Sequence, residues 1–268
     1  MVYNISMFKI FRGNKKKKTT LVIAAILVAA GILYLNRAYS HIYSTIAAAG
    51  LTPVDNKAQY FIDATNQANN METTNIVYSA LGDSLTAGAG VDNYQESLSY
   101  VLATKLSGGE KTVILNNHSL PGIETAGIIS DYLEPAISDD PDLVTVLIGI
   151  NDIHNKVSAA HFRKNYEEIL SRLKQTTKAD IYLISIPFIG ADSLMLPPYQ
   201  ALFDARTKEF NKIIKELADK YTVNYIDVYA PTVDLFKTSG DHYSRDLFHP
   251  SASGYKLWAD IIYADINK

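Results

Sequence analysis

Short apolar segments alternate with amphipathic segments from about residue 75 to the C-terminus of the chain. The apolar segments are rich in β-branched residues, and they predict strands at 76–81, 112–115, 143–148, 181–186 and 223–228. They are apolar on both faces, which is typical of a parallel sheet covered by helices on each side. The pattern therefore predicts an α/β fold, a three-layer α/β/α sandwich with a mostly parallel five-stranded sheet.

The segments between the predicted strands carry apolar residues at helical spacing. One such stripe contains Phe162, Tyr166, Ile169, Leu170 and Leu173, and a second runs from Phe203 to Tyr221. We interpret both stripes as core-facing. In an open parallel sheet of this kind, ligands bind at the carboxyl ends of the strands.

An uncharged segment covers residues 19–36, and six basic residues precede it, whereas only Arg37 follows closely. As a helix it is roughly 27 Å long, close to the thickness of a hydrocarbon core. The charge asymmetry predicts a basic cytoplasmic segment at 1–18, a transmembrane signal-anchor helix at 19–36 and an extracytoplasmic location for everything after it.

Two other interpretations of this segment exist. Ala38, Tyr39 and Ser40 offer small residues at the spacing of a signal-peptidase site, although Arg37 and nearby tyrosines make that site poor, so we favour a retained anchor over a secreted protein. The lysine run at 15–18 lacks the aromatic interleaving of a nucleic-acid site, and we expect no nucleic-acid partner.

Residues 37–74 lack a sustained amphipathic period and contain Gly50 and Pro53, so we expect a stalk or linker before a hydrolase domain at 75–268.

Seven of the 25 Lys and Arg residues lie in the first 40 positions, which contain no acid. Residues 41–268 therefore carry 18 basic and 28 acidic residues, a net charge of −10. The absence of cysteine excludes a disulfide scaffold, a thiolate metal site and a cysteine nucleophile.

A candidate nucleophile follows the first predicted strand, in the sequence Gly82-Asp83-Ser84-Leu85-Thr86. A serine at a strand-to-helix junction is exposed to substrate at the sheet edge, although such serines are more often N-caps. Thr86 stands where the nucleophile elbow of α/β-hydrolases has glycine, so a different layout is needed.

A candidate base lies near the C-terminus, where Asp246 precedes His249 by three residues and Pro250 follows. A base and the carboxylate that orients it can share one such loop. The alternative is an ordinary loop histidine beside an aspartate turn.

Together with Gly149-Ile150-Asn151-Asp152, these motifs resemble the GDSL esterase/lipase family, also called SGNH hydrolases, over about residues 76–265. The family's second block matches 117–122 and ends at Gly122. The resemblance implies that Ser84 attacks an ester, that His249 is its base and that Asp246 orients His249. It assigns the oxyanion hole to the backbone N–H groups of Ser84 and Gly122 and to the Asn151 amide.

We expect no cofactor and no metal, and we expect Asp83 and Asp152 to hydrogen-bond within their own loops. The leading hypothesis is a membrane-anchored hydrolase acting on a small-molecule, lipid or glycan ester. Removal of O-acetyl groups from an envelope polysaccharide and a catalytically silent surface binding module are the alternatives.

The loop at 187–200 contains Leu194, Met195 and Leu196, which we expect to be exposed as a lip facing an acyl chain. The oligomeric state stays open.

Overall fold

The sheet of this protein contains six strands. The computed structural model describes residues 6–51, 58–63, 75–109, 111–188, 190–238 and 240–268. The strands are β1 (Gln59–Ile62), β2 (Asn75–Gly82), β3 (Thr112–Ser119), β4 (Leu143–Leu147), β5 (Asp180–Ile184) and β6 (Asn224–Ile226). Their order is β1-β3-β2-β4-β5-β6, and every pair is parallel except the antiparallel pair of β1 and β3. The predicted three-layer, mostly parallel fold is confirmed, but the count of five strands is wrong by one.

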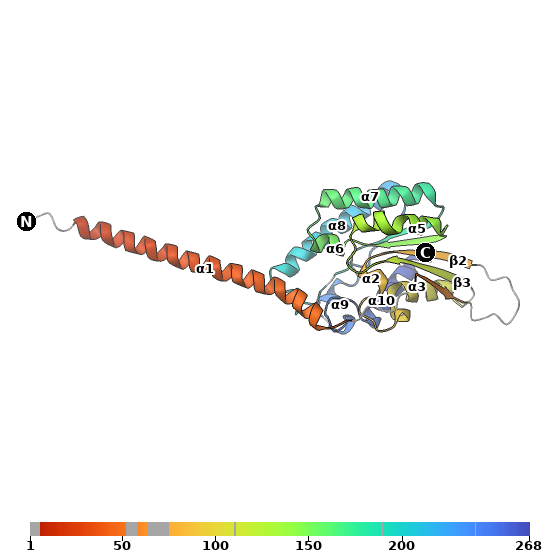
Figure 1. Ribbon diagram of the computed structural model, residues 1–268, viewed down its shortest axis with the longest axis horizontal. Helices are drawn as coiled ribbons and strands as arrows, with labels where there is room; N and C mark the ends of the chain where they lie inside the picture. The colour runs from red at the N-terminus through yellow and green to blue at the C-terminus, as the bar shows by residue number, and fades with distance from the viewer. Residues whose placement is uncertain (1–5, 52–57, 64–74, 110, 189, 239) are drawn as a thin grey trace, which may run out of the picture.

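Helices cover both faces of the sheet, as the two-sided apolar strands predict (Figure 1). One layer contains α5 (Leu133–Ser138), α7 (Ala159–Thr176) and α8 (Tyr199–Tyr221), and the other contains α3 (Leu98–Ser107) and α10 (Ala252–Ile266). Shorter elements are α2 (Ser84–Ala87), η2 (Tyr94–Glu96), α4 (Thr125–Gly127), the π-helical turn η3 (Ile128–Tyr132), α6 (Ile150–His154), α9 (Val233–Thr238) and η4 (Gly240–His242).

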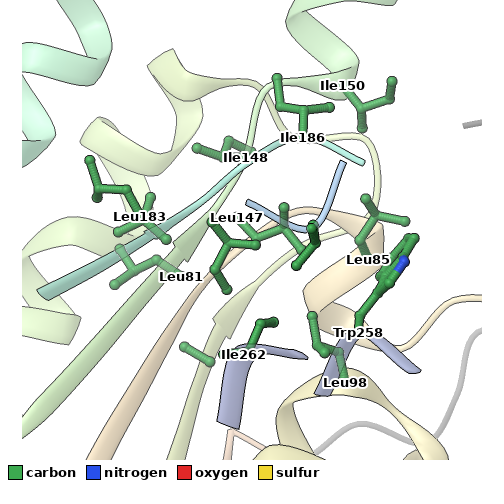
Figure 2. Packing of buried hydrophobic residues seen from close by; sticks show 14 of the residues in the cluster. Leu81, Leu85, Leu98, Leu147, Ile148, Ile150, Leu183, Ile186, Trp258 and Ile262 are labelled. Atoms are coloured by element: carbon green, nitrogen blue, oxygen red, sulfur yellow. The ribbon is translucent and has the colours of Figure 1, made fainter. Parts of the chain in front are cut away.

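The core lies between these layers and holds the strand ends in place. Figure 2 shows Leu98, Trp258 and Ile262 of α3 and α10 packed on one side of the sheet, beneath Leu147. On the other face, the predicted stripe of α7 is buried, with Phe162 stacked on Phe210 of α8 at 4.0 Å between ring centroids. Burial of each such side chain stabilises the fold by about 1.5–3 kcal/mol.

The register of the central strands brings three loops to one edge of the sheet. Gly82, the last residue of β2, pairs with Ser119, the last residue of β3, and with Leu147, the last residue of β4. The segments that follow the three strands therefore begin at the same level. These segments carry the motifs that the sequence singled out.

A long helix, α1 (Ser6–Ala48), projects from the domain (Figure 1). It is the only helix in the described ranges that is long and apolar enough to cross a membrane, a property that a signal sequence shares. Its last turns pack on the domain, where Ala38 and Ile42 are 1% exposed. The Tyr34 hydroxyl also donates to the carbonyl of Pro197 at 2.8 Å.

The predicted stalk at 37–74 therefore contains regular structure in its described parts. Helix α1 continues to Ala48 because no glycine or proline occurs between Arg37 and Gly50 and because Ala38 and Ile42, four residues apart, find a partner surface. Strand β1 lies at 59–62, whereas 52–57 and 64–74 are outside the described residues. Tyr60 of β1 stacks on Tyr94 with 4.4 Å between ring centroids.

Strand β1 covers the edge of β3, and an uncovered edge strand is a template for aggregation. We expect the free energy of unfolding of residues 75–268 to be lower than that of residues 37–268 by about 3–6 kcal/mol. The shorter fragment lacks Ile42 and Ile62, two side chains that are buried in the longer one. Urea denaturation of the two fragments measures the difference, and light scattering reports the self-association expected of the shorter one. Equal unfolding midpoints would show that these segments add nothing to the fold.

Candidate active site

Ser84 is the first residue of helix α2, directly after β2, and it is 5% exposed. Asp83 caps the helix, and its Oδ1 accepts the N–H of Leu85 at 3.0 Å. The turn requires glycine at position 82, since a Cβ there would lie 2.0 Å from Thr86 Oγ1 and 2.4 Å from the carbonyl oxygen of Leu147. The close approach of β2, α2 and β4 fixes the position of Ser84.

The structure brings Ser84, His249 and Asp246 into one hydrogen-bonded chain. His249 Nε2 lies 3.0 Å from Ser84 Oγ, and His249 Nδ1 lies 2.6 Å from Asp246 Oδ2. The three residues come from the two ends of the domain, 165 positions apart for Ser84 and His249. This is the geometry in which an imidazole can accept the serine proton while a carboxylate fixes its tautomer.

The Asp246 carboxylate is fully buried and accepts four hydrogen bonds. Besides His249 Nδ1, its donors are the backbone N–H groups of Phe248 and His249, both at 2.9 Å, and Ser244 Oγ at 2.7 Å. Burial raises the pKa of Asp246, but the hydrogen bond and charge of His249 and the other donors outweigh it, so the pKa lies below its usual value. Asp246 is therefore held as a carboxylate.

The loop that carries Asp246 and His249 is closed by its own backbone. Tyr243 forms an antiparallel bridge with Pro250, and the N–H of Ser244 donates to the carbonyl of His249 at 2.8 Å. The turn places Leu247 at φ +59°, which is uncommon for a residue with a side chain. This strain persists because the surrounding hydrogen bonds determine the turn.

Gly90 lets this loop approach the loop that follows Ser84. A Cβ on Gly90 would lie 2.4 Å from the carbonyl oxygen of Pro250 and 2.8 Å from the Cβ of His249. Its φ of +104° also favours glycine. The distance between Ser84 and His249 therefore depends on a residue that neither motif contains.

The other two predicted oxyanion groups lie on linked segments at the same sheet edge. Pro121 and Gly122 occupy a turn closed by the N–H of Ile123 donating to Leu120 at 3.2 Å, and Gly122 has the φ of +85° that such a turn requires. Asn151 Nδ2 donates to the carbonyl of Ile123 at 3.0 Å. This bond uses one of the two amide hydrogens and orients the other.

Asp152 binds beyond its own loop, which we did not expect. Its two oxygens accept the N–H of Thr125 at 3.0 Å and the Thr125 hydroxyl at 2.6 Å, which joins α6 to the segment after Gly122. Asp83 does cap its own helix, as predicted. Burial raises the pKa of Asp83 to about 7 and the pKa of Asp152 to about 6, against the hydrogen bonds that each accepts.

His154 is a neighbour of the site that the motifs do not reveal. Its ring packs against Phe203 at 4.7 Å and Phe248 at 5.3 Å between centroids, and its Nε2 is buried without a hydrogen-bond partner. Burial, and then the proximity of His249, lower the pKa of His154 to about 4, so it is neutral at physiological pH. Among the described residues, no three His, Asp or Glu side chains gather in a way that could hold a metal ion.

The expectation that the loop at 187–200 exposes an acyl-facing lip is wrong for Leu194 and Met195. Leu194 is fully buried and Met195 is 2% exposed. The loop turns inward because the N–H of Ala191 donates to the carbonyl of Leu247 at 3.0 Å, which ties it to the His249 loop. Apolar residues in a loop therefore seal the domain here and do not face solvent.

The GDSL-like lipase/acylhydrolase family model matches residues 80–257, which include every residue of the candidate site. The protein belongs to this family. The named relatives below are lipases and esterases, so the chain is assigned to the carboxylic-ester hydrolases.

Two curated relatives represent different substrates within these hydrolases. The spore germination lipase LipC of Bacillus licheniformis is 26% identical over 213 residues, covering 70% of this chain and 94% of the relative. An acetylxylan esterase of Geobacillus stearothermophilus is 23% identical over 156 residues, covering 56% of this chain and 70% of the relative.

Solved structures of the GDSL-like type share the fold. A lipase/acylhydrolase from Enterococcus faecalis matches with a TM-score of 0.59 at 22% identity, covering 71% of this chain and 95% of its own. The acetylxylan esterase Axe2 of Geobacillus stearothermophilus matches with a TM-score of 0.57 at 19% identity, covering 73% and 96%. The match to the family model begins at residue 80, after the N-terminal helix.

The raised pKa of Asp83 predicts a pH dependence of stability. An acid whose pKa is higher in the folded than in the unfolded protein takes up a proton on folding, so the free energy of unfolding falls as pH rises from about 4 to about 7. We expect Asp83→Asn, which keeps the cap, to be more stable than wild type by on the order of 2–4 kcal/mol at about pH 8 and equally stable near about pH 4. Parallel urea-unfolding profiles of the two proteins across this range would contradict it.

Proposed function

We propose that this protein is a membrane-anchored, extracytoplasmic serine hydrolase that uses Ser84, His249 and Asp246 as a catalytic triad. The observation that carries the proposal is the hydrogen-bonded chain from Asp246 through His249 to Ser84. A surface module that only binds has no need of a buried carboxylate aligned on a histidine and a serine, so this chain disfavours the catalytically silent alternative.

In the proposed reaction, Ser84 Oγ attacks the ester carbonyl carbon while His249 Nε2 takes the serine proton. Collapse of the tetrahedral intermediate breaks the bond to the alcohol, and His249 returns the proton to that leaving oxygen. A water molecule, deprotonated by His249, then attacks the acyl-serine. The second tetrahedral intermediate collapses, the bond to Ser84 Oγ breaks to release the acid, and His249 returns the proton to Ser84 Oγ. Asp246 keeps the proton on His249 Nδ1 and stabilises the imidazolium.

The oxyanion hole is assigned to the backbone N–H groups of Ser84 and Gly122 and to the Asn151 amide. Ser84 supports this role because it opens a helix, where an N–H has no intrahelical partner. Gly122 is exposed, and no atom lies within 4 Å of the position of a Cβ, so the space beside it is open to substrate. Asn151 has the second amide hydrogen available for a developing negative charge.

The packing of α1 supports a retained anchor over signal cleavage. Cleavage after Ser40 would remove Ala38, which is 1% exposed, and the hydrogen bond from Tyr34 to Pro197. A segment destined for removal has no reason to complete the surface of the mature domain. With the basic residues before the apolar run inside, the hydrolase domain lies on the outer side of the membrane.

An O-acetyl esterase acting on an envelope polysaccharide is the second candidate. It is favoured by the similarity to the acetylxylan esterase of Geobacillus stearothermophilus. The two candidates share the site and differ only in the substrate bound beside it.

The triad is tested by substitution. We expect Ser84→Ala to abolish ester hydrolysis and labelling by a fluorophosphonate, because no other oxygen takes its place beside His249. His249→Ala should lower kcat by roughly 10³-fold or more, and Asp246→Asn should cost less because the base survives in a poorer tautomer.

His242 is the matched control for His249. It lies in η4 and stacks on Phe236 with 5.4 Å between ring centroids. His242→Ala should keep kcat within a few-fold of wild type. Equal losses for the two histidine variants, at equal folded fraction by circular dichroism, would overturn the assignment of the base.

The topology is tested on intact cells. The full-length chain should remain in the membrane fraction, and protease added to cells with permeable outer layers should digest the domain while sparing the first 18 residues, because the basic flank stays inside. Mass spectrometry of the protein identifies its N-terminus. A soluble form beginning near His41 would establish a signal peptide instead.

A further inference from the structure

A cavity of about 590 Å³ lies between helix α1 and the hydrolase domain. Its α1 wall contains Asn36 and Tyr39, and its domain wall comes from α6 and α8, where it includes His154, Leu202 and Phe203. The volume lies in the range of cavities that bind small molecules. The α6 and α8 wall lies within the match to the family model, whereas the α1 wall lies outside it.

The position of the cavity along α1 places it at the level of the membrane surface in the proposed topology. The uncharged run that would cross the bilayer ends at Asn36, the first lining residue of α1. Tyrosines surround this level, and the Tyr199 hydroxyl donates to the carbonyl of Leu35 at 3.1 Å while the ring of Tyr39 packs on that of Tyr199 at 5.3 Å. Such an aromatic belt is typical of a membrane interface.

A single layer of aromatic side chains separates the inner end of the cavity from His249, the proposed base. His154 lines the cavity, its ring contacts Phe248, and Phe248 contacts His249 at 4.9 Å between ring centroids. His154 is also three residues after Asn151 on α6. The α6 wall of the cavity and Asn151 of the proposed oxyanion hole therefore lie on the same short helix.

The chemistry of the lining suits an amphiphile. Leu202 is 56% exposed, and it does not stand alone, because Ile153, Phe203 and Tyr39 line the same cavity and extend the apolar surface. Lys156 and Arg206 also line the cavity and supply positive charge. A water-soluble acetylated glycan has no group that would fill an apolar cavity of this size.

We propose, on the basis of the proposed ester hydrolysis, that this cavity holds the acyl chain of a single-chain ester lipid taken from the membrane, and that α1 serves as one wall of the site as well as an anchor. The chain lies between α1 and α8 while its ester group reaches Ser84 past α6. The cavity replaces the loop at 187–200 as the surface that selects the acyl chain.

The test compares kcat/KM for dodecanoyl and acetyl esters of p-nitrophenol, using the full-length enzyme in nonionic detergent micelles. We expect wild type to prefer the dodecanoyl ester, since each methylene that leaves water can add up to about fourfold. Leu202→Trp fills the cavity from α8 and Asn36→Trp fills it from α1, and each should lower this preference by about tenfold or more. The ratio is independent of the fraction of folded enzyme.

The controls are Leu235→Trp and Leu33→Trp, which are exposed apolar positions on α9 and α1 outside the cavity lining, and both should keep the wild-type preference. A wild-type enzyme that prefers the acetyl ester or acetylated xylo-oligosaccharide would overturn the acyl site. An effect of Leu202→Trp without an effect of Asn36→Trp would overturn the role of α1. If the wild-type enzyme hydrolysed neither ester and were not labelled by the fluorophosphonate, the proposed function itself would be refuted.

Discussion

The hydrogen bonds to the buried Asp246 carboxylate are the interaction on which the site depends. A carboxylate without water is stable only if donors replace the lost hydration, and each hydrogen bond to a charged group contributes about 1.5–3 kcal/mol. All four donors come from residues 244–249 themselves, so the charge shapes the loop that presents it. The left-handed conformation of Leu247 is the local cost of that arrangement. Removal of the carboxylate would release the loop as well as the His249 ring.

A second buried carboxylate, Asp152, performs a similar task for the segment after β3. Asp152 binds both the backbone and the hydroxyl of Thr125, while its neighbour Asn151 binds the carbonyl of Ile123. The segment after β3 is therefore attached to α6 at two successive residues. The groups that face a substrate in the proposed mechanism lie on short turns, and these carboxylates give those turns the rigidity that the sheet gives to Ser84.

The sequence was informative where a local pattern has one structural outcome. The apolar runs predicted five strands because a two-sided covered strand has few polar residues, and the spacing of Asp246 and His249 predicted their contact because three residues form one turn. Strand β1 was missed because an edge strand of four residues has no apolar period of its own. The partner of Asp152 lies 27 residues away, and the burial of Leu194 depends on the loop that Ala191 binds, so neither can be seen in local spacing.

In the proposed topology, the continuity of α1 into the domain would hold the active site at a fixed distance from the membrane. A flexible linker over residues 37–74 would let the domain range over roughly 35 Å from its anchor. A helix that runs unbroken to Ala48 and is buried at Ala38 and Ile42 removes that freedom and couples the orientation of Ser84 to the tilt of the anchor. In the proposed topology the enzyme would search in two dimensions, and lateral diffusion in the bilayer would set how often it meets a substrate.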